Sequence, residues 1–151
     1  MKYKKIKPYK ELEPFIHFYW ELKGNEQKGL WERVFPDGCA GIFMSLGNSC
    51  LTDNGALSLE YGKTYVVGAM TSFKDSFIDC DTHLIGVCFK PGAFANFYRY
   101  IPQIELINNT VEFEKSKSFN IAKMLKAPFN YFDHFYSGRI KSKNNPLQSV
   151  I

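Results

Sequence analysis

Turn-forming residues interrupt residues 16–90 about every ten residues, and this spacing allows only short extended segments between them. Pro36-Asp37-Gly38 and Asp53-Asn54-Gly55 are examples, since Pro presets φ, Asp bonds its own backbone and Gly accepts positive φ. Residues 16–23 alternate strictly, which predicts a half-buried strand with one apolar side formed by Ile16, Phe18, Trp20 and Leu22. The pattern predicts an antiparallel β-sandwich or barrel.

The hydrophobic period changes after residue 90. Before it, we expect strands at residues 16–23, 30–35, 40–46, 57–61, 64–67, 77–80 and 84–89. After it, apolar residues at helical spacing predict a helix at 94–101 ended by Pro102, and a second helix near 118–127 capped by Ser118. A third short helix carries Phe129 and ends at Gly138. The chain is therefore predicted to be α+β: mainly an antiparallel β-sandwich or barrel, followed by two or three short helices.

The length and composition favour one folded domain. The chain has 151 residues, of which 45% are hydrophobic and 17% aromatic, far too many for a disordered chain. We place this domain at residues 1–138 and interpret 139–151 as a polar, basic linker and the start of a further element. Since neither a 20-residue apolar span nor a signal peptide is visible, we expect a cytoplasmic protein that does not bind membranes.

Positive charge lies at the two ends of the sequence. Residues 1–10 contain five Lys, and residues 91–151 carry a net charge of +4, whereas residues 11–90 carry −5. A domain that reads DNA usually has a basic stripe on its main body. We therefore expect that this part of the chain does not itself read DNA, and that the Lys-rich start is either a solvated end or a docking arm.

Motifs for catalysis and metal binding are missing from the sequence. No nucleophile elbow, zinc-protease helix or phosphate-binding loop is present, so we expect no enzyme activity and no cofactor. The four cysteines lack a C-x-x-C pair and are interpreted as thiols: Cys39, Cys50, Cys80 and Cys88. Since Cys80 and Cys88 lie in apolar runs, we expect them to be buried and structural. The three histidines, His17, His83 and His134, are far apart in sequence, so no metal is expected. A site made of two histidines with Glu21 or Asp81 is the remaining alternative.

Aromatic residues on the predicted strands suggest a ring-lined pocket. The candidate pocket residues are Trp20, Trp31, Arg33, Phe43, Tyr65 and Phe89. A small barrel can hold one small ligand, and an arginine beside aromatic rings would suit a ligand with a carboxylate or phosphate. The alternative is that the rings form an ordinary core and the arginine reaches solvent.

A stripe of aromatic residues on the last predicted helix suggests an interface. Phe129, Phe132, Phe135 and Tyr136 share one side of this helix. A monomer of this size seldom exposes such a stripe, so these residues are candidates for a dimer interface. Packing of the same stripe against the barrel is the equally weighted alternative.

Several motifs, in their order, resemble the N-terminal domain of AraC/XylS-type bacterial transcriptional regulators. They are Glu13-Pro14-Phe15-Ile16, Val34-Phe35-Pro36-Asp37-Gly38-Cys39, Ile42-Phe43-Met44-Ser45-Leu46-Gly47, Val66-Val67-Gly68 and the joint from Ile85 to Phe94 (IGVCFKPGAF). The resemblance spans roughly residues 8 to 110 and extends more loosely to the end.

The resemblance implies a cupin-like barrel that binds a small effector, mediates dimerisation, or both. It further implies a homodimer and a C-terminal helix-turn-helix domain, outside these 151 residues, that binds DNA and regulates transcription. Two alternatives stay open. One is a free-standing cupin-like protein that binds small molecules or is a metalloenzyme; the other is an interaction module with a filled barrel.

Overall fold

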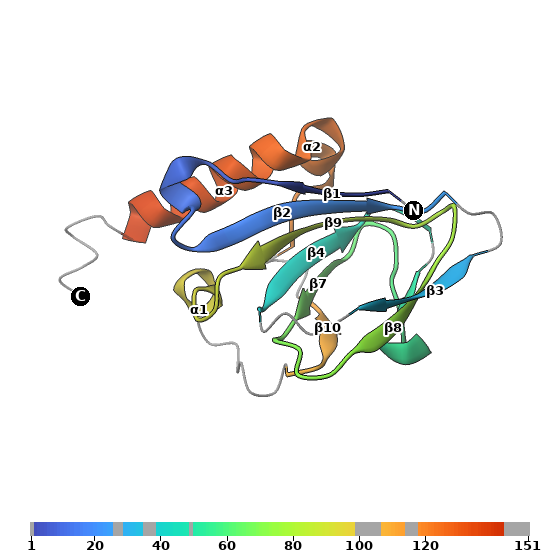
Figure 1. The fold of residues 1–151 in the computed structure, drawn as a ribbon. Coiled ribbons are helices and arrows are strands. Elements are labelled where there is room, and N and C mark those ends of the chain that lie inside the picture. The colour runs from blue at the N-terminus through green and yellow to red at the C-terminus, as the bar shows by residue number, and fades with distance from the viewer. Residues whose placement is uncertain are drawn as a thin grey trace.

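Two β-sheets and a long C-terminal helix make up the computed structural model of the chain (Figure 1). The structure describes residues 2–25, 29–34, 39–48, 50–98, 107–113 and 118–143. Within these residues, all paired strands are antiparallel, and the predicted α+β fold with an antiparallel β-sandwich is confirmed. The predicted turn at 36–38 and the apolar segment 147–151 lie outside the described residues.

The larger sheet, sheet A, has the strand order β1-β2-β9-β4-β7-β10. Its strands are β1 (Lys2–Ile6), β2 (Ile16–Lys23), β9 (His83–Phe89), β4 (Gly41–Ser45), β7 (Thr64–Val67) and β10 (Thr110–Glu112). The smaller sheet, sheet B, has the order β3-β8-β5-β6. Its strands are β3 (Leu30–Val34), β8 (Lys74–Ile78), β5 (Leu51–Thr52) and β6 (Leu57–Ser58).

The helical elements lie mainly beside sheet A. They are the 3₁₀ turns η1 (Lys10–Leu12) and η2 (Asp53–Gly55) and the helices α1 (Phe94–Phe97), α2 (Ile121–Lys126) and α3 (Pro128–Lys143). Figure 1 shows α3 lying across the sheet next to β1 and β2. No helix among the described residues is long and apolar enough to cross a membrane.

The central strands of sheet A are buried on both faces, which explains why they read as continuous apolar runs. All five residues of β4 are buried. On the side that we call the helix face, Ile42 and Val87 pack with Phe132 and Tyr136 of α3. On the opposite side, the inner face, Phe43, Tyr65 and Leu84 pack towards sheet B, with Leu57 of β6 against them. Strands with two buried faces place alternate residues in two separate cores.

A β-bulge corrects the predicted alternation of β2. The register places Ile16 opposite Phe89 but Phe18 opposite Cys88, so one extra residue, His17, is inserted between them. Successive residues of a strand point to opposite faces. Ile16 therefore lies in the core of the helix face, fully buried, and not on the side that carries Phe18.

The Lys-rich start of the chain is a strand rather than a separate arm. Residues Lys2–Ile6 pair with β2 at the edge of sheet A, although four of the five side chains are exposed. Lysines on an edge strand oppose pairing with other chains. The segment that follows, η1, attaches to α3, where Ser137 Oγ donates a hydrogen bond to Glu11 at 2.7 Å.

Buried polar contacts hold α3 on the sheet. The carboxylate of Asp133 accepts hydrogen bonds from Tyr19 Oη at 2.7 Å and from the backbone N–H of Tyr9 at 3.0 Å. Burial, and then this carboxylate, raise the pKa of Tyr19 far above its ordinary value, so its hydroxyl stays a donor. The position of α3 relative to β2 and η1 is thus specified by hydrogen bonds as well as by apolar packing.

The predicted helix boundaries need three corrections. The first helix is one turn, Phe94–Phe97, and the cap of α2 is Asn120, whose side chain accepts from the N–H of Lys123, rather than Ser118. Helix α3 does not end at Gly138 but continues to Lys143, so residues 139–143 of the predicted linker are helical. Residues 144–151 lie outside the described part, and the domain boundary stays a prediction.

Candidate functional site: an apolar cavity on the inner face of sheet A

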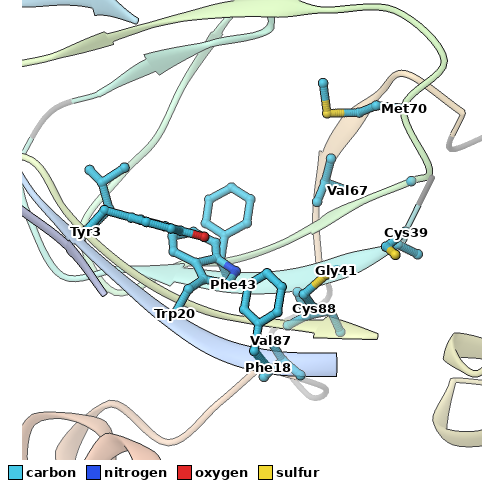
Figure 2. A pocket seen from close by; sticks show the side chains of 14 residues that line it. Tyr3, Phe18, Trp20, Cys39, Gly41, Phe43, Val67, Met70, Val87 and Cys88 are labelled. Carbon is cyan, nitrogen blue, oxygen red and sulfur yellow. The ribbon is translucent and has the colours of Figure 1, made fainter. Parts of the chain in front are cut away.

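A cavity of about 200 Å³, partly open to solvent, lies on the inner face of sheet A. Aromatic side chains of β2 and β4 form one wall, and Val67 and Met70, at and after the end of β7, lie across from them (Figure 2). Tyr3 of β1 lies at one end, and Cys39 and Cys88 lie towards the other. The lining is mostly apolar. Its polar side-chain groups are the phenol of Tyr3, the thiols of Cys39 and Cys88, and the indole N–H of Trp20.

A glycine in β9 provides the space for the largest ring. Trp20 of β2 lies opposite Gly86, and a Cβ on Gly86 would come within 2.6 Å of the indole ring. It would also come within 2.7 Å of Cβ of Phe43, on the strand at the other side of β9. Only glycine therefore allows Trp20 and Phe43 to meet across β9, where their ring centroids are 5.9 Å apart.

The aromatic wall continues into the core. The ring of Phe43 stacks on that of Tyr65 at 5.5 Å, and Tyr3 lies 6.3 Å from Trp20. Tyr65 is itself buried, and its hydroxyl accepts the N–H of Glu60 at 2.8 Å. Burial raises the pKa of Tyr65, so this ring stays neutral. The cavity thus has a neutral aromatic wall that is fixed by packing behind it.

The predicted pocket residues fall into three groups. Trp20 and Phe43 line the cavity, and Tyr65 supports Phe43 from behind. Trp31 lies on sheet B with 54% of its surface exposed and packs against Phe77. Phe89 lies fully buried on the helix face, among α1 and α3. The fold therefore does not bring Trp31 and Phe89 together with Trp20.

Arg33, the predicted anion-binding residue, is also outside the cavity. It lies on β3, half exposed, and its Nε is 3.1 Å from a carboxylate oxygen of Asp75 on the neighbouring strand. Its guanidinium group lies 3.9 Å from the ring centroid of Phe73. Arg33 is thus engaged on sheet B and does not place a positive charge beside the cavity.

The predicted dimer stripe is divided by the fold. Phe132 and Tyr136 are fully buried on the helix face of sheet A, which is the intramolecular packing that stood as the alternative to a dimer interface. Phe129 and Phe135 are partly buried beside the same core. Of these four, Phe135 also lines a shallow hollow on the outer surface of α2 and α3, together with Tyr131 and His134.

Residues that the sequence did not single out complete the site. Tyr3, Phe18, Val67 and Met70 all line the cavity. Phe18 could have been found from its alternation with Trp20, but the others reach the cavity through strand pairings between distant segments. A second unexpected group is His17, Cys39 and Cys88, whose ligand atoms all lie within 4.8 Å of one another.

Comparison with known proteins identifies a family without an assigned function. No curated protein matches the chain. Residues 4–112, most of the chain, match the family described as "Domain of unknown function (DUF6597)". This range contains every lining residue of the cavity except Tyr3, and it contains the whole His17–Cys39–Cys88 group. The chain therefore belongs to the DUF6597 family.

Proposed function

We propose that this domain binds a small apolar molecule in the cavity on the inner face of sheet A, as the effector-binding half of a transcriptional regulator. The observation that carries the proposal is the aromatic-lined cavity itself. Ligand sites are typically concave and mostly apolar, with few polar groups to orient the ligand. Here Tyr3, the indole N–H of Trp20 and the two thiols are such groups.

The size of the cavity limits the ligand. Its volume of about 200 Å³ is below the roughly 300–1,000 Å³ of sites for drug-sized ligands. A closed apolar cavity of roughly 150 Å³ binds benzene. The proposed effector is therefore a single-ring or short aliphatic compound, held by stacking on Trp20 and Phe43 and by burial of apolar surface.

The lining supports binding more than catalysis. General acid–base catalysis needs titratable groups within hydrogen-bond reach of the substrate. The ring and aliphatic wall of this cavity, which includes Trp20, Phe43 and Val67, holds a ligand but exchanges no proton with it. The titratable side chains of the lining, Tyr3, Cys39 and Cys88, lie towards its two ends. This separation of the titratable groups from the aromatic wall supports the proposal of a binding domain rather than an enzyme.

The same strands offer a route from the cavity to α3. Strand β9 presents Cys88 to the cavity, while its neighbour Val87 packs on the helix face with Phe132 and Tyr136. Strand β2 likewise presents Trp20 to the cavity, while Tyr19 donates its hydrogen bond to Asp133 of α3. In the proposal, an effector that binds one strand arrangement better than another shifts the position of α3.

Dimerisation and DNA binding are also part of the proposal, but they rest on the sequence resemblance and not on the cavity. The resemblance to AraC/XylS-type regulators supports a homodimer and a separate DNA-reading domain in the parent protein. Sedimentation velocity of the purified protein over a hundredfold concentration range tests the homodimer. A species of monomer mass throughout the range would remove dimerisation from the proposal and leave effector binding intact.

Fluorescence of Trp20 tests the proposed binding site. The chain has two tryptophans, and Trp31 is exposed on sheet B, so the Trp31→Phe variant reports on Trp20 alone. Bromobenzene is a suitable probe, because its heavy atom quenches indole fluorescence on contact and its single ring fits the cavity. We expect saturable quenching of Trp20 in this variant. In the Trp20→Phe variant, Trp31 should show only the linear quenching of random collisions.

A cavity-filling substitution provides the matched control. Val67→Phe places a ring in the cavity, whereas Val111→Phe makes the same change at an exposed valine of the neighbouring strand β10. We expect Val67→Phe to weaken bromobenzene binding at least tenfold and Val111→Phe to leave it unchanged. Linear quenching in the Trp31→Phe variant, or equal affinity in both valine variants, would contradict the proposal.

A further inference from the structure

Three residues with metal-binding side chains meet at one end of the cavity. The ligand atoms of His17, Cys39 and Cys88 all lie within 4.8 Å of one another, although the residues are distant in sequence. Two of the three, Cys39 and Cys88, also line the cavity. All four cysteines of the chain are thiols rather than disulfides. Cys88 is buried as predicted, whereas the same prediction for Cys80 is wrong, because Cys80 lies exposed in the turn after β8.

The strand pairing explains how these residues meet. Cys88 on β9 lies opposite Phe18 of β2 on one side and opposite Gly41 of β4 on the other. Cys39 precedes Gly41 by two residues, and His17 is the extra residue of the bulge beside Phe18. Bulges commonly redirect a side chain at a functional site. His17 and Cys88 thus lie on neighbouring strands, and Cys39 lies just before the next strand, at the same end of sheet A.

We propose that His17, Cys39 and Cys88 form a binding site for a soft divalent cation of the Zn²⁺ class. Thiolate and imidazole are the ligands that zinc prefers in proteins, and two thiolates balance the charge of the ion. Tetrahedral coordination with Zn–S near 2.3 Å and Zn–N near 2.0 Å places the ligand atoms about 3.5–3.8 Å apart. From separations within 4.8 Å, side-chain movements of about 1 Å complete that geometry.

The proposed metal site leaves one coordination position of the ion open beside the cavity. Three protein ligands leave a fourth coordination position of a tetrahedral ion for water or another donor. Since Cys39 and Cys88 line the cavity, a small molecule bound there can supply this donor from a thiol, amine or imidazole group. The metal site goes beyond the proposed effector binding and does not depend on it.

Cobalt binding provides a direct test. Co²⁺ takes the place of Zn²⁺ in tetrahedral thiolate sites and gives strong near-ultraviolet charge-transfer absorption together with visible bands. Titration of the reduced, metal-free protein should give one Co²⁺ per chain with these bands, and added Zn²⁺ should remove them. His17→Gln changes an exposed position and removes a direct ligand. Loss of a residue that only hydrogen-bonds to a ligand typically costs roughly 10–100-fold in metal affinity, so we expect a larger loss of Co²⁺ affinity for this variant.

The other two cysteines supply matched controls. Cys39→Ser should weaken Co²⁺ binding and lower the charge-transfer absorption per bound ion, because one of the two thiolates is lost. Cys80→Ser, at an exposed position, and Cys50→Ser, in the neighbouring core, should preserve both. Circular dichroism of each variant establishes that it is folded. Absence of the charge-transfer band in the native protein would overturn the proposal. Equal Co²⁺ affinity in the native, His17→Gln and Cys39→Ser proteins would also overturn it.

Alkylation gives a second readout without cobalt. Zn²⁺ should protect the partly exposed Cys39 from iodoacetamide, and the exposed Cys80 should react at the same rate with and without the ion. Cys88 is buried and should react slowly in both conditions. Burial raises the pKa of Cys50 to about 11, so this thiol should react slowly in both conditions. Equal alkylation of Cys39 with and without Zn²⁺ would contradict the site.

Discussion

Replacing Phe132 with alanine should remove a central part of the contact between α3 and sheet A. The side chain of Phe132 is fully buried on the helix face. Its ring centroid lies 5.1 Å from that of Tyr19 and 5.0 Å from that of Phe119, both within the range of favourable aromatic pairs. The Phe132→Ala variant therefore loses buried surface and its ring contacts, including those with Tyr19 and Phe119, and it leaves a cavity behind.

The expected cost is a substantial part of the stability of the domain. Truncation of a buried phenylalanine to alanine typically costs about 3–5 kcal/mol. Domains of this kind are stable by only about 5–15 kcal/mol in total. With a urea dependence of about 2 kcal/mol per molar, the unfolding midpoint should fall by roughly 1.5–2.5 M.

Urea unfolding followed by circular dichroism measures this change. Leu125→Ala is the control, because Leu125 lies on α2 with 58% of its surface exposed and should change the free energy of unfolding by no more than about 0.5 kcal/mol. A loss below about 1 kcal/mol for Phe132→Ala would refute the assignment to the core. So would a midpoint that depends on protein concentration in the native chain and not in the variant, since that result would place Phe132 at a subunit interface.

Three further predictions test other parts of the structure. Gly86→Ala should push the ring of Trp20 into the cavity, lower the free energy of unfolding by about 1–3 kcal/mol and weaken bromobenzene binding, as measured by urea unfolding and fluorescence. Gly138→Ala should stabilise α3 by about 0.5–1 kcal/mol in urea unfolding, because Gly138 lies inside the helix with nothing within 4 Å of a Cβ; destabilisation would contradict the continuous helix. Burial alone would raise the pKa of Glu21, but its hydrogen bond with His83 at 2.8 Å and nearby lysines lower it. The stability advantage of native protein over Glu21→Gln should therefore be complete above a pH of about 5 and disappear as the pH falls through the lowered pKa; a pH-independent difference would contradict this pairing.

The strands that could be predicted are those with a clear pattern and clear ends. Residues 16–23 and 64–67 form strands with the predicted bounds, because turn residues flank a strict alternation or an apolar run. Strand β1 was missed, since its side chains are almost all exposed and only pairing with β2 holds it. Strand β10 is only three residues long and likewise depends on its partner, β7.

The candidate site depends on topology, which local patterns do not specify. Trp20 and Phe43 were predicted as pocket residues from their ring type, but their contact needs β9 to lie between β2 and β4 and to carry Gly86 there. Alternation alone does not say which face of a strand is buried by a helix and which by a second sheet. It therefore predicts Phe89 as a pocket residue, although Phe89 lies on the helix face. The bulge at His17 has no local sequence signal, and the metal-ligand group depends on it.

Methyl NMR of the methionines tests most directly whether the cavity binds a small apolar molecule. Met70 lines the cavity, whereas Met44 and Met124 lie in the core of the helix face. With [¹³C]methyl-methionine protein and benzene as the probe, we predict a saturable shift of the Met70 signal that exceeds the shifts of Met44 and Met124. An unchanged Met70 signal at saturating benzene, or equal shifts of all three, would contradict the proposed ligand site.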